Sequence, residues 1–284
     1  CRLILIDPKG SSFNIYTDIP HLLTPVIRDT GQAIVALKWM LKEVENRNRV
    51  MSSLGVRTIA SYNARLRDAL EKGQTLTRTV QVGFDAETNQ PKYEEQALDM
   101  TPLPLVVVVV DEMAPLMKIA SKAMENLITH LMQVARISGV HLILSTSETS
   151  TEVITPSVAN NFPARIAFQV ETKIDSRTIL NEAGAENLLG PGDMLYLAQG
   201  GRMMRVHAPY VSQGEIETVV AHLQAEGEPN YVSAVLDDSR AKAVIDATAK
   251  GHDRSKPEYK GDEELFRQAV LLVGLGGRHR AKAR

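Results

Sequence analysis

A run of five valines at residues 106–110 constrains the fold of this chain more than any other stretch, and Asp111 and Glu112 follow it directly. A short, unbroken β-branched run is typical of a strand buried on both faces, as in a parallel sheet. Ligands of open α/β sheets bind at the carboxyl ends of such strands. The sequence therefore predicts a central strand that carries two acids to the ligand-binding edge of a sheet.

Asp111 and Glu112 have the chemistry of a phosphoryl-transfer site. In an ATPase the first acid would hold the hydration shell of Mg²⁺, and the second would orient or deprotonate the attacking water. Many buried strands also end in a polar pair that serves solubility alone. Because the strand by itself does not separate these two interpretations, the surrounding sequence has to decide between them.

Composition indicates a globular chain without a membrane span. The 284 residues are 44% hydrophobic and 23% charged, enough for one large α/β domain with an appendage or for two small domains. The net charge of −2 gives no global attraction to nucleic acid, so such contacts would come from local basic clusters. The single cysteine, Cys1, excludes an internal disulfide and fits a reducing cytosol. No apolar run approaches the roughly 20 residues that a membrane helix needs.

The order of expected elements predicts the fold class. Buried strands at residues 3–6, 105–110, 141–144 and 165–170 alternate with helical patterns, which predicts a mostly parallel sheet covered by helices. Residues 76–98 alternate in the strand manner and predict an inserted antiparallel hairpin. The chain begins inside a core strand with no leader before it, so we expect that upstream sequence is missing.

Local signals place several boundaries. Asp29 with Gln32 resembles a capping box that starts a helix running to about Leu54, where Gly55 stops it. The charges on the other face of this helix are expected to be solvated: Lys42, Glu43, Glu45, Arg47 and Arg49. Asp175 is a possible cap for a helix that includes Ile179. Two glycines at 200 and 201 predict a hairpin between strands at 193–196 and 203–207.

The domain organisation follows from a change in composition. Residues 1–227 have the pattern of one α/β domain, and Ser212 with Glu215 forms a capping box for its last helix. Residues 228–261 are polar and typical of a linker. Residues 262–284 begin a second helical unit and end in a basic run that does not complete it.

Six stretches, in order, resemble the motor domain of the FtsK/SpoIIIE family of DNA translocases. Each is a weak signal alone, but the ordered set is highly specific and covers roughly residues 1–235. The stretches are LIDPK at 5–9, IPHLLT at 19–24, LGVR at 54–57, VDEM at 110–113, KIDSRTIL at 173–180 and GPGDML at 190–195.

The resemblance implies a RecA-like P-loop NTPase core that binds ATP and Mg²⁺, assembles as a homo-hexameric ring and pumps double-stranded DNA through its pore. It implies a motor at the cytoplasmic face of the bacterial inner membrane, anchored through a missing N-terminal region and acting in chromosome segregation and cell division. A winged-helix module follows the motor in the family, and residues 262–273 look like its first helix.

The resemblance also assigns roles to single residues. Asp111 would bind Mg²⁺ through water, and Glu112 would manage the attacking water. Arg136 matches the family's trans-acting arginine, although a cation also suits the C-terminal end of a helix. Lys173 and Arg177 match the second pore loop and would contact DNA phosphates without reading bases; a solvated helix start is the alternative, but a cation near a helix N-terminus is slightly unfavourable.

Several departures from the family pattern leave a second hypothesis open. The sequence contains no Gly-Lys pair, so the glycine-rich phosphate-binding loop is absent from it and is expected upstream. Ser147 and Glu148 stand where the family typically has glutamine and arginine, which puts DNA contact by that loop in doubt. Gly10 replaces a larger residue, and Pro115 is tolerable only in a first helical turn. The alternative to a DNA-translocating ATPase is therefore a catalytically inactive, FtsK-like scaffold or interaction subunit.

Overall fold

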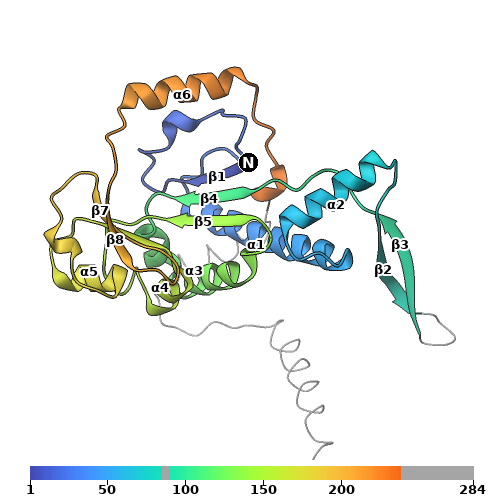
Figure 1. The fold of residues 1–284 in the computed structure, drawn as a ribbon, viewed down its shortest axis with the longest axis horizontal. Coiled ribbons are helices and arrows are strands. Elements are labelled where there is room, and N and C mark those ends of the chain that lie inside the picture. The colour runs from blue at the N-terminus through green and yellow to red at the C-terminus, as the bar shows by residue number, and fades with distance from the viewer. Residues whose placement is uncertain (85–89, 238–284) are drawn as a thin grey trace, which may run out of the picture. The chain divides into compact units, whose positions relative to one another are not determined.

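A parallel three-stranded sheet forms the centre of the computed structural model, which describes residues 1–84 and 90–237 (Figure 1). The valine run forms its middle strand, β4 (Val106–Val110), flanked by β1 (Arg2–Ile6) and β5 (Val140–Leu144). Val108 pairs with Ile4 on one side and with Leu142 on the other, both in parallel. The prediction of a central parallel strand is confirmed.

Helices cover this sheet on both faces, as the α/β pattern predicted. On one face α1 (Thr30–Ser53) and α3 (Ala114–Ala135) bury Ile4, Ile6 and alternate valines of β4 in the main core. On the other face Leu5 and Val109 pack with Val220 of α6 (Gln213–Ala225). Val107 and Val109 stay partly exposed, so the second face of β4 is buried less completely than the sequence suggested.

Helix α1 begins and ends where the sequence predicted, but its charged face is not wholly solvated. The carboxylate of Asp29 accepts a hydrogen bond from the backbone N–H of Gln32, and Gly55 follows the helix at φ +67°. Arg47, by contrast, is only 4% exposed. Its guanidinium donates to Glu43 and to the backbone carbonyls of Pro104 and Ser138, at 2.8, 2.8 and 3.1 Å. The expectation of a solvated Arg47 is wrong, because neighbouring segments supply acceptors for it inside the protein.

An antiparallel hairpin is inserted before β4, as the alternation in the sequence predicted. It consists of β2 (Thr77–Phe84) and β3 (Pro91–Ala97), and its expected tip at 85–89 lies outside the described residues. Helix α2 (Ile59–Glu71), which precedes the hairpin, was not anticipated. A small hydrophobic core packs the end of α1, helix α2 and the residue after β3 together: Met51, Leu54, Tyr62, Leu66 and Leu98.

A separate antiparallel sheet follows the helix α4 (Pro156–Asn161). It contains β6 (Arg165–Phe168), β7 (Asp193–Leu197) and β8 (Met203–His207), and α5 (Lys173–Leu180) connects its first two strands. The hairpin of β7 and β8 is as predicted. β6, which the sequence grouped with the parallel strands, instead pairs antiparallel with β7.

Residues after α6 pack against the main core of the domain. The described part of the chain contains three short 3₁₀ helices, at Asn14–Tyr16, Ala185–Asn187 and Ser233–Val235. Val235 in the last of them is fully buried in the main core, and the N–H of Val232 donates to the carbonyl of Leu23 at 2.8 Å. The remainder of the expected linker, 238–261, and the expected winged-helix start, 262–284, lie outside the described residues. Across residues 1–84 and 90–237, no helix has the length and apolarity to cross a membrane.

Candidate functional site

Asp111 and Glu112 lie side by side in the sequence at the carboxyl end of β4, but their side chains have different surroundings. The backbone of Asp111 is fixed, since its N–H donates to Ile6 at 3.0 Å and its carbonyl accepts from the Ser145 hydroxyl. Its partly exposed carboxylate makes no hydrogen bond to any other side chain in the described part of the chain. Asp111 is therefore free to reach a hydrated cation.

The Glu112 carboxylate is held by four donors and is 5% exposed. Oε2 accepts from Lys9 Nζ at 3.1 Å, and from the backbone N–H and the hydroxyl of Ser147 at 3.1 and 2.6 Å. Oε1 accepts from the N–H of Ala114 at 3.2 Å. Lys9 comes from the turn after β1 and Ser147 from the loop after β5, so both neighbouring strands support the acid of the central one.

These donors keep Glu112 ionised. Burial raises the pKa of this carboxyl, but the hydroxyls of Ser147 and Thr146 and the backbone N–H groups of Ser147 and Ala114 lower it to about 2. A general base works best when its pKa lies near the working pH. A carboxylate with so low a pKa is a weak proton acceptor.

Asp7 has a structural role at the same edge. Its carboxylate is fully buried and accepts the backbone N–H groups of Gly10, Ser12 and Phe13, at 2.8, 2.8 and 3.0 Å. Burial raises the pKa of Asp7, and these backbone donors outweigh it and lower the pKa. Gly10 adopts φ +72° in this turn, a conformation that favours glycine and accounts for the small residue there.

Pro115 falls in the first turn of α3, the position in which a proline is tolerated. Arg136 caps the far end of the same helix and is exposed. Helix α3 has 22 residues with a kink at Ala120, where φ is −136° and ψ is 41°. Within the described residues Arg136 makes no ion pair, and it follows the end of α3 opposite to Glu112.

Lys173 and Arg177 are both exposed and lie four residues apart on α5, so they share one face of the helix. Thr172, rather than the expected Asp175, caps the helix, and Asp175 completes the capping box from the third position. Backbone donors at Gly184 and Glu186 lower the pKa of Glu186, and the charges of Lys173 and Arg177 lower it further. The two cations therefore lie together on α5, which connects two strands of the antiparallel sheet, whereas Asp111 follows a strand of the parallel sheet.

Side chains of the loop at 145–150 contact both Glu112, at the carboxyl end of β4, and Asp175 of α5. Ser147 contacts Glu112, Glu148 pairs with Lys118 of α3 at 2.6 Å, and the Thr149 hydroxyl donates to Asp175. Sequence reasoning treated Ser147 and Glu148 as losses and missed these partners. One signal pointed to them, because the carboxyl ends of adjacent parallel strands meet at the same edge.

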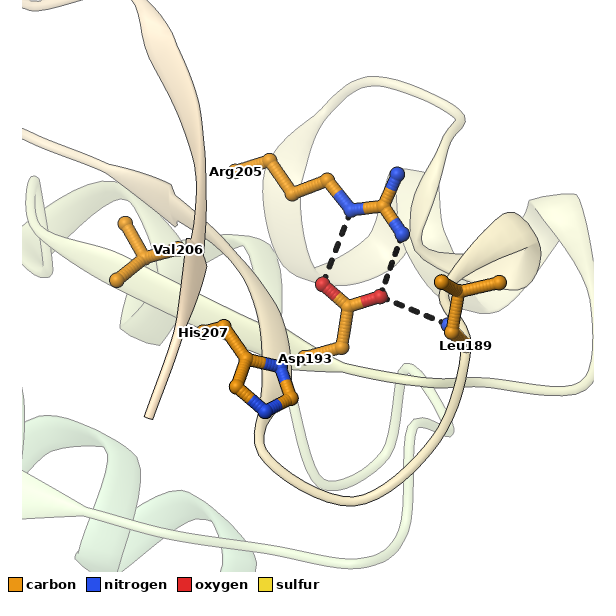
Figure 2. Close-up of a pocket in the computed structure, with 5 residues that line it drawn as sticks. All are labelled: Leu189, Asp193, Arg205, Val206 and His207. Atoms are coloured by element: carbon orange, nitrogen blue, oxygen red, sulfur yellow. Dashed lines mark hydrogen bonds and ion pairs between the residues drawn. The ribbon is translucent and has the colours of Figure 1, made fainter. Parts of the chain in front are cut away.

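A separate hollow of about 350 Å³ lies beside Asp193 of the GPGDML motif, and Figure 2 shows it lined by Leu189, Asp193, Arg205, Val206 and His207. Arg205 binds both carboxylate oxygens of Asp193, at 3.0 and 2.6 Å, and the N–H of Leu189 donates to the same carboxylate at 2.8 Å. The arginine, followed by this backbone donor, lowers the pKa of Asp193 to about 2. The motif thus fixes the start of β7 by an internal ion pair.

Curated relatives share about half of their residues with this chain over almost its whole length. DNA translocase FtsK of Bradyrhizobium diazoefficiens is 51% identical over 278 residues, which are 96% of this chain and 33% of that protein. The FtsK proteins of Agrobacterium fabrum and Caulobacter vibrioides are 48% and 46% identical, over 98% and 96% of this chain and 31% and 33% of theirs. The chain therefore spans about a third of the length of these relatives.

Two solved structures share the fold at lower identity. The conjugation coupling protein TcpA of pCW3, a monomer form with ATPγS, has a TM-score of 0.60 and 20% identity, covering 79% of this chain and 57% of that one. The cytoplasmic domain of the type VII secretion ATPase EccC of Thermomonospora curvata has a TM-score of 0.56 and 18% identity, covering 81% and 25%. These likenesses show that the chain has the α/β fold of those two structures. The FtsK/SpoIIIE family model matches residues 1–158, more than half of the sequence, and the chain belongs to that family.

Proposed function

We propose that this chain is part of the motor of an ATP-driven, double-stranded DNA translocase. The observation that carries the proposal is the acid pair at the carboxyl end of β4. The carboxylate of Asp111 makes no hydrogen bond to another described side chain, whereas that of Glu112 binds Lys9 and Ser147 and has its pKa lowered to about 2, with Ser147 as the largest lowering cause. Two carboxylates with such different surroundings suit a site where one binds a hydrated cation and the other orients a water.

Asp111 would hold Mg²⁺ through water. Mg²⁺ keeps several of its waters and is commonly bound by one or two carboxylates together with substrate phosphates. The single free carboxylate of Asp111 fits that mode, and within residues 1–84 and 90–237 no cluster of three metal-ligating side chains competes with it. Bound Mg²⁺ and ATP would supply the electrophilic phosphoryl group. Since the chain has no Gly-Lys pair, the phosphate-binding loop would come from a segment outside residues 1–284.

Lys173 and Arg177 would contact DNA. Both project from one exposed face of α5, and a pair of cations at this spacing suits two backbone phosphates without reading bases. Arg136 would act on the nucleotide site of a neighbouring subunit in a homo-hexameric ring, which agrees with its position at the far end of α3 from its own Glu112.

Hydrolysis by the full-length protein tests the proposal. We expect ATP hydrolysis that double-stranded DNA stimulates, and we expect Glu112→Gln to abolish it because the substituted amide lacks the charge that orients the water. Glu152→Gln is the matched control, since Glu152 is an exposed acid in the following loop. Absence of hydrolysis in the wild type, or full activity of Glu112→Gln, would refute the mechanism.

Mixing two inactive variants tests the role of Arg136. If Arg136 serves a neighbour's site, rings that contain both Arg136→Ala and Glu112→Gln subunits include some intact sites, so part of the activity returns. If Arg136 acts within its own subunit, every site lacks one of the two groups and the mixture stays inactive. Assembly of the mixed rings is checked by size and mass.

A non-catalytic FtsK-like scaffold is the second candidate, and the loop after β5 favours it. Glu148 forms an ion pair with Lys118 instead of offering a cation to DNA, and Ser147 replaces the family's usual glutamine. Ring assembly without hydrolysis in the full-length protein would support the scaffold over the motor.

The remaining assignments extend the same proposal. The motor domain would include residues 228–237, which pack on its core, with a linker after it and a winged-helix module from residue 262. The protein would work in chromosome segregation and cell division at the cytoplasmic face of the bacterial inner membrane, held there by a region outside this chain.

A further inference from the structure

Three consecutive residues of the loop after β5 each bind a different element of the fold. The Ser147 hydroxyl donates to Glu112 at the end of β4, at 2.6 Å, and the Glu148 carboxylate pairs with Lys118 of α3, at 2.6 Å. The Thr149 hydroxyl donates to Oδ1 of Asp175 in the first turn of α5, at 2.5 Å. One short loop therefore connects the proposed water-orienting acid to the helix that carries the proposed DNA contacts.

The loop is held at both ends and braced inside. At its start the N–H of Ser145 donates to Val110, and at its end the N–H of Val153, whose side chain is fully buried, donates to Ser150. Glu148 is fixed within the loop, because its N–H donates to the Thr146 hydroxyl at 3.1 Å and its carboxylate accepts from the Ser150 hydroxyl at 3.2 Å. With its ends and middle restrained, a displacement at Ser147 cannot be absorbed freely before it reaches Thr149.

Asp175 is the receiving end of this connection. Its Oδ2 accepts from the N–H and the hydroxyl of Thr172, at 3.1 and 2.7 Å, and so closes the capping box that starts α5. Its Oδ1 is bound to Thr149. The same carboxylate therefore caps the helix and attaches it to the loop, so loss of the Thr149 bond acts directly on the first turn, which contains Lys173.

The three contacts depend on the residue types present in this chain. An arginine at position 148 would place like charges against Lys118, and a proline at position 149 would have no side-chain donor for Asp175. Ser147 and Glu148, which depart from the family pattern, therefore form one mutually consistent set of contacts together with Thr149.

We propose that residues 147–149 form a coupling loop, in which Thr149 is a positioning residue that links the state of Glu112 to the placement of α5. The expected effect on DNA-stimulated hydrolysis rests on the proposed function. The connection from Glu112 to α5 through residues 147–149 does not depend on that function. A water that donates a hydrogen bond to Oε2 of Glu112 would compete with Ser147 for that oxygen and free the Ser147 side chain. The resulting movement of the loop would reach Asp175 through Thr149. Physical coupling of this kind needs a two-site test.

Hydrogen exchange of the α5 backbone in the full-length protein supplies that test. Thr149→Val should speed exchange in the first turn of α5, and Ser147→Ala should do so as well, although Ser147 does not contact α5. Thr149→Ser, which keeps the donor, should restore slow exchange, and Thr151→Val, a change at an exposed threonine of the same segment, should have no effect. Unchanged α5 exchange in Ser147→Ala would overturn the coupling.

Hydrolysis adds a functional readout. Thr149→Val should lower the ratio of DNA-stimulated to basal hydrolysis by about threefold or more, and Thr149→Ser should restore the ratio. If DNA stimulates hydrolysis by the wild type and Thr149→Val leaves the ratio unchanged, the coupling is refuted. If DNA does not stimulate the wild type, the proposed function fails, and the exchange of α5 alone decides whether the loop couples.

Discussion

Ser147 donates both its backbone N–H and its hydroxyl to a single oxygen of Glu112, Oε2, at 3.1 and 2.6 Å. The ammonium of Lys9 lies 3.1 Å from the same atom. Hydrogen bonds from these donors stabilise the charged form of the carboxylate, so the loop after β5 lowers the pKa of the acid at the end of β4.

Removing the Ser147 hydroxyl should weaken the hold on this carboxylate. In Ser147→Ala the pKa of Glu112 should rise from about 2 toward its ordinary value of 4.5, since the largest of the lowering contributions is gone. Carbon-detected NMR titration of the Glu112 carboxyl measures the shift. Ser150→Ala, which removes a hydroxyl that binds Glu148 instead, is the control. Identical titration of wild type and Ser147→Ala would show that the hydroxyl does not set the pKa.

Glu112 should make stability depend on pH in the acid range. Its folded pKa of about 2 lies below the ordinary 4.5, so its contribution is fully present above pH 4.5 and is lost as the pH falls through 2. That contribution is at most about 3 kcal/mol. Urea unfolding at pH 7 and at pH 3 should show the stability gap between wild type and Glu112→Gln narrowing at the lower pH. A gap that stays constant would contradict the assigned pKa.

Arg47 should be the most sensitive charged residue of α1. Arg47→Met removes three hydrogen bonds and leaves the carbonyls of Pro104 and Ser138 without this donor. We expect a loss of about 3 kcal/mol in the free energy of unfolding. Arg49→Met, at an exposed position of the same helix, should change it by less than about 0.5 kcal/mol. Similar losses in the free energy of unfolding for the two variants would mean that the buried hydrogen bonds of Arg47 do not contribute to stability.

Two glycines at positive φ should respond differently to alanine. At Gly192, φ +82°, a Cβ would lie 2.6 Å from the backbone oxygen of Ala208, whereas at Gly200, φ +66°, it would meet nothing within 4 Å. Gly200→Ala should cost about 1 kcal/mol from backbone strain alone. Gly192→Ala adds a clash that backbone cannot easily relieve and should cost about 2 kcal/mol or more. Thermal unfolding of both variants compares them directly.

The basic pair on α5 should contribute to DNA affinity through phosphates alone. Lys173→Ala and Arg177→Ala should each reduce the slope of log affinity against log salt by about 0.9, whatever the DNA sequence. Lys122→Ala, which removes an exposed lysine of α3, should leave the slope unchanged. A sequence-dependent loss of affinity would instead indicate base contacts.

Some features of the fold could be predicted because they depend on local pattern. The β-branched run predicted β4, and the Asp29 cap with Gly55 predicted the limits of α1, since propensity and capping act over a few residues. Helix α2 was missed, although Thr58 caps its start and its buried residues Tyr62, Leu66 and Ala69 recur at helical spacing. The pairing of β6 with β7 was also missed, since strand direction depends on partners distant in the sequence.

For the valine strand and its two acids, the sequence by itself determined the element, its place in a parallel sheet and the family of the chain. The tertiary structure alone decided that Glu112 is clamped while Asp111 is free, that Arg47 is buried, and that Ser147, Glu148 and Thr149 bind three separate elements. The physical reason is that periodicity and capping are properties of neighbouring residues, whereas burial, ionisation and hydrogen-bond partners depend on groups that only folding brings together.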